Sequence, residues 1–93
     1  MTELQLDGHT FEGFSIPTSN TTILIIKARH GILGCGYLSL ATAEKVGDAL
    51  ALVSGVKSFD DMLNARIGAF SAAAAARGVV SEMSGREALL KLV

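Results

Sequence analysis

The chain has 93 residues, 49% of them hydrophobic, and a formal net charge of −1. That length predicts a single domain over residues 1–93 with a small core. Eight basic against nine acidic side chains, without a basic cluster, exclude the electrostatic footprint of a nucleic-acid binder, and no apolar run approaches the about 20 residues of a membrane span.

The segment LQLDGHTF at residues 4–11 predicts a β-hairpin, because Asp7-Gly8 favours the positive φ angles of a two-residue turn. The residues that face each other across this hairpin are Leu6 with His9 and Leu4 with Phe11. One face is therefore apolar, and a lone hairpin with an apolar face is marginal in water. We expect residues 1–17 to form an N-terminal β-hairpin region that takes part in oligomerisation.

The segments TTILIIKA and ILGCGYL predict a second hairpin around Arg29-His30-Gly31, with Gly31 in the left-handed position of a bulged turn. This three-residue turn pairs Ala28 with Ile32, and alternation then gives two faces. The first face comprises Ile23, Ile25, Lys27, Leu33, Cys35 and Tyr37. The second comprises Leu24, Ile26, Ala28, Ile32, Gly34, Gly36 and Leu38. Because both faces are apolar, we expect both to be covered.

In this register Gly34 and Gly36 lie side by side and form a flat strip of backbone. Glycine inside a strand often marks close approach by another backbone or by a ligand. We expect a helix that begins at residue 39 or 42 and ends near residue 54 to lie over the strip, with Gly47 on its inward face. Gly34, Gly36 and Gly47 are therefore predicted to be a close-packing strip, with a ligand-binding strip as the less favoured alternative.

The C-terminal part predicts short elements. Ser58, followed by two aspartates, is typical of a helix start, and the alanine-rich segment before Gly78 is helical by propensity. Ser84–Glu87 is a capping box that opens a last helix, whereas periodicity leaves Ala65–Phe70 open between helix and strand. The predicted fold class is α+β, a mostly antiparallel sheet of four or five strands with helices packed on one face.

Four motifs between residues 31 and 89 carry a family resemblance that runs over nearly the whole chain. They are G-x-L-x-C-G-Y at Gly31–Tyr37, T-A-E-K-x-G-D at Thr42–Asp48, GVKSFDDML at Gly55–Leu63 and GREAL at Gly85–Leu89. With these motifs the sequence resembles the YunC-like family of bacterial and archaeal domains of unknown function. The resemblance implies a compact α+β fold, a strand within Ala65–Phe70 and an N-terminal β region used for tetramerisation. It supplies no activity, substrate or catalytic residue.

Cys35 is the only candidate nucleophile. In the predicted register Lys27 lies diagonally across the strand pair from it, and a neighbouring ammonium group favours the thiolate form. His30 is a candidate base, although it projects from the turn and no third group is present to orient it. A catalytic group of Cys35, Lys27 and His30 is one hypothesis. Burial of Cys35 as a small apolar residue is the favoured one.

Metal and cofactor sites are not indicated. His9, His30 and Cys35 lack chelating spacing, so we expect no metal and no cofactor. The acidic, alternating start of the chain is unlike a signal peptide and a single cysteine forms no internal disulfide, so we expect a cytoplasmic location.

The large apolar fraction suggests a function. A mean hydropathy of +0.44 is high for so small an interior and favours burial against further copies of the chain. We therefore expect a homo-oligomer, a dimer or a tetramer, that serves as a binding or assembly module for a partner or an unidentified small-molecule ligand, without nucleic-acid or membrane partners. The alternative is a thiol-dependent enzyme or redox-sensitive protein that uses Cys35.

Overall fold

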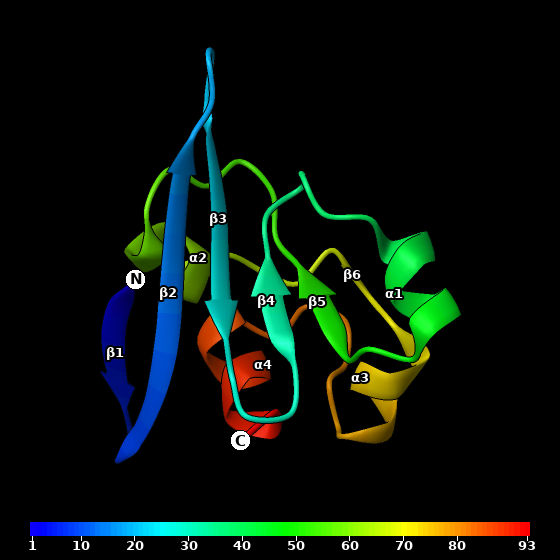
Figure 1. The fold of residues 1–93 in the computed structure, drawn as a ribbon. Coiled ribbons are helices and arrows are strands. Elements are labelled where there is room, and N and C mark those ends of the chain that lie inside the picture. Colours follow the sequence, from blue (N-terminus) through cyan, green and yellow to red (C-terminus); the bar gives the residue numbers. More distant parts are fainter.

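A computed structural model describes all residues from 1 to 93. It contains one six-stranded sheet and four short helices (Figure 1). The strands are β1 (Thr2–Leu6), β2 (His9–Pro17), β3 (Thr22–Lys27), β4 (Ile32–Gly34), β5 (Leu50–Leu52) and β6 (Ala69–Phe70). The helices are α1 (Leu40–Val46), α2 (Phe59–Asn64), α3 (Ala72–Ala76) and α4 (Gly85–Lys91). The strands lie in sequence order, and all neighbours are antiparallel except β4 and β5.

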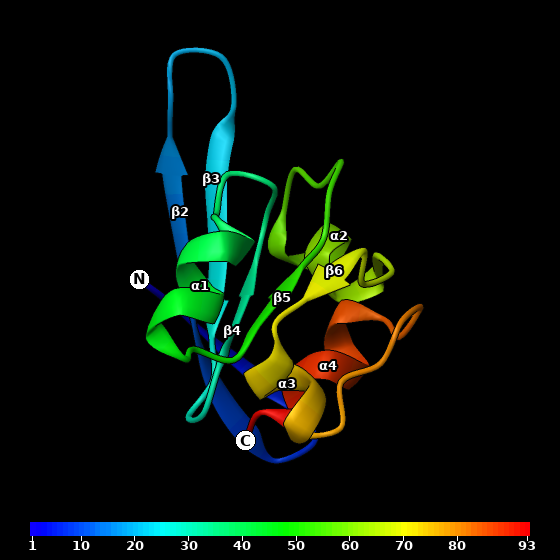
Figure 2. The same cartoon turned by 90° about the vertical axis from the view of Figure 1, so that its right-hand side faces the viewer.

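The predicted fold class, α+β with a mostly antiparallel sheet, is confirmed. The sheet has six strands where four or five were expected, because the segments around residues 50–52 and 69–70 each add a short strand. The helices also do not share one face. Helices α2 and α4 pack on one side of the sheet and α1 lies on the other (Figure 2).

The first hairpin forms as predicted. Asp7 and Gly8 both have positive φ angles, 49° and 82°, which a two-residue turn between twisted strands requires. The register pairs Leu6 with His9 and Leu4 with Phe11. Phe11 is 1% exposed, so the apolar face of this hairpin joins the common core rather than remaining open.

The predicted register of the second hairpin is wrong by one residue. The observed pairs are Lys27 with Ile32, Ile26 with Leu33 and Ile25 with Gly34. The loop holds four residues, and the Ala28 N–H donates to the Gly31 carbonyl at 2.8 Å. Gly31 does not take a positive φ angle. It serves close packing instead, since a Cβ there would lie 2.8 Å from the Leu92 side chain and 2.9 Å from the Ala49 carbonyl oxygen.

The shifted register changes which residues share a face, because side chains alternate along a strand. One face, which we call the covered face, carries buried side chains from β3 and from the β4 region. They are Leu24, Ile26, Ala28, Leu33 and Cys35. The opposite face carries Ile23, Ile25, Lys27, Ile32 and Gly34, and none of the side chains on it is fully buried.

The long helix expected to reach residue 54 is also wrong. Ser39 caps α1 by accepting a hydrogen bond from the Thr42 N–H, and the helix ends at Gly47, whose φ is 83°. The following residues form β5, parallel to β4. Ser71 fixes the start of this strand, since its Oγ accepts from the Leu50 N–H at 3.0 Å and donates to the Asp48 carbonyl at 2.7 Å.

Backbone-close contacts hold the helices on the covered face. A Cβ on Gly13 in β2 would lie 2.8 Å from the ring of Phe59 in α2. A Cβ on Gly85 in α4 would meet the Met62 carbonyl oxygen and would lie 2.9 Å from Leu33. A methyl group at Gly85 would therefore push α4 away from α2, whereas one at Gly13 would require the Phe59 ring to shift.

The remaining predicted signals are confirmed. Ser58 accepts from the Asp61 N–H at the start of α2, and α3 ends before Gly78, which has a φ of 103°. The strand that the family resemblance implied within Ala65–Phe70 is β6, paired with β5.

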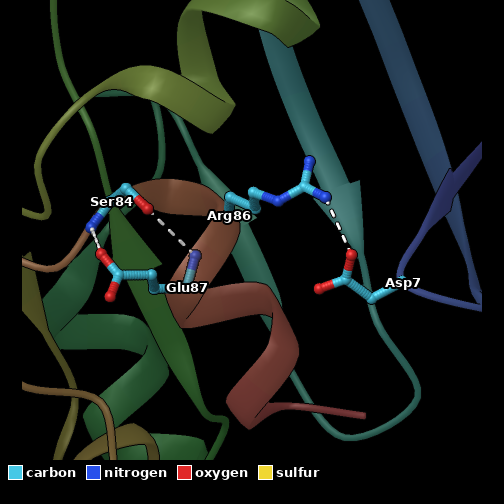
Figure 3. A network of polar contacts seen from close by, with 4 residues as sticks. All are labelled: Asp7, Ser84, Arg86 and Glu87. Carbon is cyan, nitrogen blue, oxygen red and sulfur yellow. Dashed lines mark hydrogen bonds and ion pairs between the residues drawn. The ribbon is translucent and has the colours of Figure 1, made fainter.

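The capping box at the start of α4 is complete (Figure 3). The Glu87 N–H donates to Ser84 Oγ at 3.1 Å, and the Ser84 N–H donates to Glu87 Oε1 at 3.0 Å. This backbone hydrogen bond, together with the Ser84 side chain, lowers the pKa of Glu87 from its ordinary value of 4.5. Next to it Arg86 forms an exposed ion pair with Asp7 in the β1–β2 turn, at 3.0 Å, a type of contact that contributes little to stability.

Replacing Ser84 by alanine is expected to lower the free energy of unfolding by about 1 kcal/mol, the usual cost of losing a helix cap.

Because the pKa of Glu87 is lower in the folded than in the unfolded chain, its ionised form stabilises the fold above the unfolded pKa. That contribution is lost as pH falls through the folded pKa. Denaturant unfolding of wild type and of Glu87→Gln between pH 7 and pH 3 measures this contribution. The difference between their free energies of unfolding should shrink in acid, and a difference that stays constant with pH would contradict the prediction.

Candidate functional site

Cys35 lies on the covered face, directly after β4. It is 7% exposed, its N–H donates to the Leu24 carbonyl at 3.1 Å, and its Sγ accepts from the Leu24 N–H at 3.4 Å. The thiol therefore continues the pairing between the two strands and belongs to the hydrophobic core cluster.

The structure does not bring Cys35, Lys27 and His30 together. Lys27 pairs with Ile32 and therefore projects from the face opposite Cys35. The His30 side chain is exposed in the β3–β4 loop, and the backbone N–H of His30 donates to the Leu92 carbonyl at 2.8 Å. The predicted register placed the thiol beside Lys27, and the one-residue shift removes that juxtaposition. A catalytic role for these three residues stays a prediction.

Cys35 borders a hollow of about 330 Å³ beside the start of β3. The other lining residues are Thr21, Thr22, Gly36, Tyr37, Gly55, Val56 and Lys57. Lys57, rather than Lys27, is the cation in this lining. The hollow contains no histidine or carboxylate that could serve as a base.

We expect slow alkylation of Cys35 in the folded chain, because the thiol is almost completely buried and accepts a backbone hydrogen bond. Iodoacetamide labelling followed by mass spectrometry measures the rate, with and without denaturant. Labelling should become much faster on unfolding. Equal rates in both states would show that the thiol is open to reagents in the native protein.

The three glycines of the predicted strip do not form one surface. Gly34 is buried, and a Cβ there would overlap the side chain of Leu38. Gly36 and Gly47 are exposed, a Cβ on either would meet no atom within 4 Å, and Gly47 is the C-cap of α1. Close packing therefore occurs at Gly34, beneath Leu38, and the strip as a ligand site stays a prediction.

An apolar surface occurs on β2 and β3, on the face opposite the core. We call it the β2–β3 patch and define it by Phe14, Ile16, Ile23 and Ile25. Cross-strand pairing places Phe14 beside Ile25 and Ile16 beside Ile23. Ile16 is 51% exposed and the other three are half-buried, with Ile23 also in contact with the hydrophobic core cluster.

The hairpin that carries this patch projects beyond its neighbours (Figure 1). Strand β1 pairs with β2 only as far as Gly13, and β4 pairs with β3 only from Ile25 towards Lys27. Residues 15–23 therefore form a two-stranded ribbon with few neighbouring strands. A ribbon of this kind has little stability by itself.

A second apolar feature lies on the same face, under α1. A hollow of about 230 Å³ is lined mainly by apolar side chains between the helix and the sheet. These include Ile32, Leu38, Ala43, Val46 and Leu50. Val46 is 64% exposed at its rim. Helix α1 thus covers the β4–β5 half of this face and leaves the β2–β3 half more open.

No metal-binding cluster of three or more His, Cys, Asp and Glu side chains is present in the chain. None of the helices has both the length and the apolar character needed to cross a membrane.

Lys27 and His30 line a different hollow, next to the β3–β4 loop. Arg29 from the same loop, Asp48 from the α1–β5 connection and Arg77 from the end of α3 complete its charged lining. The sequence pattern did not indicate Arg77 as a site residue. Its approach depends on β5 lying parallel to β4, a pairing that the expected long helix excluded.

Three comparisons relate the chain to known proteins. The sequence model described as "Domain of unknown function (DUF1805)" matches residues 34–92, more than half of the chain. The uncharacterized protein YunC of Bacillus subtilis is 29% identical over 97 residues, covering 100% of this chain and 96% of that protein. The crystal structure of TA1206, a protein of unknown function from Thermoplasma acidophilum, matches 99% of this chain and 90% of its own, with 34% identity and a TM-score of 0.94. The expected family is thereby confirmed: the chain belongs to the DUF1805 family.

Proposed function

We propose that this protein is a homo-oligomeric module whose copies pack through the β2–β3 patch, and that it acts by binding a partner or a small molecule where the subunits meet. The observation that carries the proposal is the projecting hairpin, with Ile16 51% exposed opposite Ile23. Contiguous exposed apolar side chains on a small protein often mark an interaction surface.

Burial energies favour an assembled state. Fully burying an isoleucine contributes about 1.5–3 kcal/mol relative to leaving it exposed. Ile16 has the largest share of this still to gain, and the half-buried Phe14, Ile23 and Ile25 would each add a smaller part. Association through the patch would also give the two-stranded ribbon of residues 15–23 packing partners from the second copy. A two-fold arrangement places the patch against its own copy, the commonest way in which identical subunits associate.

The charged groups next to the patch are compatible with such packing. Glu12 and Lys27 pair across β2 and β3 on the same face, at the end of the patch away from the projecting tip. Opposite charges side by side at the rim of an interface leave its centre apolar, the arrangement typical of protein interfaces.

The test is to place a charge within the patch. Ile16→Glu is expected to weaken self-association about tenfold or more, because the carboxylate would have to lose its hydration in the interface. Val80→Glu is the matched control, since Val80 is 56% exposed and lies outside the patch. Light scattering across a dilution series should show dissociation of Ile16→Glu at concentrations where wild type and Val80→Glu remain assembled. Identical behaviour of the two variants would contradict the proposal.

A thiol-dependent enzyme or redox-sensitive protein is the alternative function. Its supporting observation is the hollow that Cys35 borders with Lys57, since a cation near a thiol favours the reactive thiolate. The test is the rate of Cys35 labelling in the folded chain as a function of pH. Fast labelling whose rate rises with pH, with a midpoint well below the ordinary thiol pKa of about 8.5, would support this alternative over the assembly module.

A further inference from the structure

The hollow beside the β3–β4 loop has about 350 Å³ of free volume and a strongly basic lining. Three of the chain's eight basic side chains, Lys27, Arg29 and Arg77, line it together with His30. Asp48 is the one carboxylate among the lining residues. The chain as a whole carries a net charge of −1, so this concentration of positive charge is local.

None of the three cations forms an ion pair in the protein, although Glu12 lies across the strand pair from Lys27. The only ion pair of the chain joins Arg86 to Asp7, on a different part of the surface. No side-chain hydrogen bond engages Lys27, Arg29 or Arg77, whereas Arg66 donates to the Glu82 carbonyl. Their donors therefore remain available to a ligand in a concave site, where charged groups with apolar neighbours attract counter-ions.

The loop that carries Arg29 and His30 is held by one hydrogen bond within the loop and by two at its end to other segments. The Ala28 N–H donates to the Gly31 carbonyl at 2.8 Å, the His30 N–H to the Leu92 carbonyl at 2.8 Å, and the Ile32 N–H to the Ala49 carbonyl at 2.9 Å. In Figure 1 the loop lies beside the C-terminal end of α4. A fixed loop loses little conformational entropy when a ligand binds.

The same loop contains unused backbone donors. The N–H groups of Arg29 and Gly31 donate to no acceptor within the chain. Backbone N–H groups next to arginine side chains are a common combination at sites for oxyanions, because both present hydrogen atoms to the same ligand oxygens.

From this geometry we propose that the hollow binds the phosphate group of a small molecule. Arginine forms paired hydrogen bonds with phosphate oxygens, and several cations on separate elements suit a group with three or more oxygens and about two negative charges. The volume lies at the lower end of small-molecule sites, so it accommodates more than the phosphate alone. Asp48 supplies an acceptor for a hydroxyl or amino group of the same ligand.

The site overlaps the edge of the β2–β3 patch only at Lys27. Arg29 in the β3–β4 loop and Arg77 after α3 lie outside the patch, which extends towards the opposite end of the β2–β3 hairpin. Loss of phosphate binding and loss of assembly can therefore be measured independently on the same variants.

The test is a titration with inorganic phosphate and with pyrophosphate, followed by backbone amide NMR at constant ionic strength. We expect saturable shifts at Arg29 and Gly31, with pyrophosphate binding more tightly because it carries more charge. Arg29→Gln and Arg77→Gln should each weaken binding about tenfold or more, the usual effect of losing a hydrogen bond from a charged donor.

Lys45→Gln is the matched control, since Lys45 is exposed on α1 and does not line the hollow. It removes one positive charge from the chain but should change the affinity by no more than about twofold, because exposed charges that are not in contact with the ligand are weakened by solvent and salt. The use of two arginine variants keeps the test decisive if one of them is unstable. Shifts that do not saturate, or an equal loss of affinity in Lys45→Gln, would overturn the proposal.

Discussion

Replacing Gly85 by alanine is expected to lower the free energy of unfolding by about 3 kcal/mol or more. The added methyl group would overlap the carbonyl oxygen of Met62 in α2 and would lie 2.9 Å from Leu33 in β4. A backbone carbonyl cannot rotate away as a flexible side chain can, so α4 would have to move away from α2. Urea unfolding followed by circular dichroism measures the loss.

Gly36→Ala is the control for this substitution. Gly36 is exposed, has no positive φ angle, and a Cβ there would meet no atom within 4 Å. The methyl group should therefore change stability by less than about 1 kcal/mol, and in the stabilising direction if it only restricts the unfolded chain. Similar losses in both variants would show that the close approach of α4 to α2 does not account for the effect of Gly85→Ala.

Ile26→Ala is expected to lower the free energy of unfolding by about 2–5 kcal/mol, the range for a large aliphatic side chain removed from a core. Ile26 is 0% exposed and packs in the core cluster. Its partner across the strands, Leu33, is equally buried. Removing the side chain would leave a cavity beneath the centre of the sheet.

Ile25→Ala, one residue earlier in β3, is the matched comparison. Ile25 is half-buried on the opposite face, so its removal should cost at least about 1 kcal/mol less than removal of Ile26. Both variants must be compared at one low protein concentration, because assembly through the patch would add to apparent stability. Equal losses at that concentration would indicate that both faces are covered within a single chain.

Local signals made part of this fold predictable. Asp7-Gly8 determined both the first turn and its register, since only a two-residue loop fits this pair. Serine side chains indicated the starts of α1, α2 and α4, because each accepts a hydrogen bond from the N–H three residues later. These features depend on neighbours in the sequence, which is why the sequence contains enough information to place them.

The features that were missed depend on residues far apart in the chain. Gly31 was assigned to a bulged turn, whereas it is needed for the approach of Leu92, near the end of the chain. Leu50 and Val53 fit helical spacing equally well, but pairing with β4 makes their segment a strand. A short apolar run satisfies both periodicities, and only its tertiary partner decides between them.

The register error had the largest consequence for the candidate site. A shift of one residue moved Cys35 from the face of Lys27 to the face of Leu24, which separates the thiol from its proposed cation. The pairing of β2 with β3, which the sequence analysis did not predict, places Phe14 and Ile16 beside Ile25 and Ile23. The apolar content of the chain was expected to exceed what one small core requires, but the location of the open surface could be found only from strand pairing.

The mass of the native wild-type particle tests the central claim most directly. Size-exclusion chromatography with light scattering, repeated over a range of protein concentrations, should give two or four times the chain mass of 9.7 kDa. A particle of one chain mass at every concentration would contradict burial of the β2–β3 patch between copies.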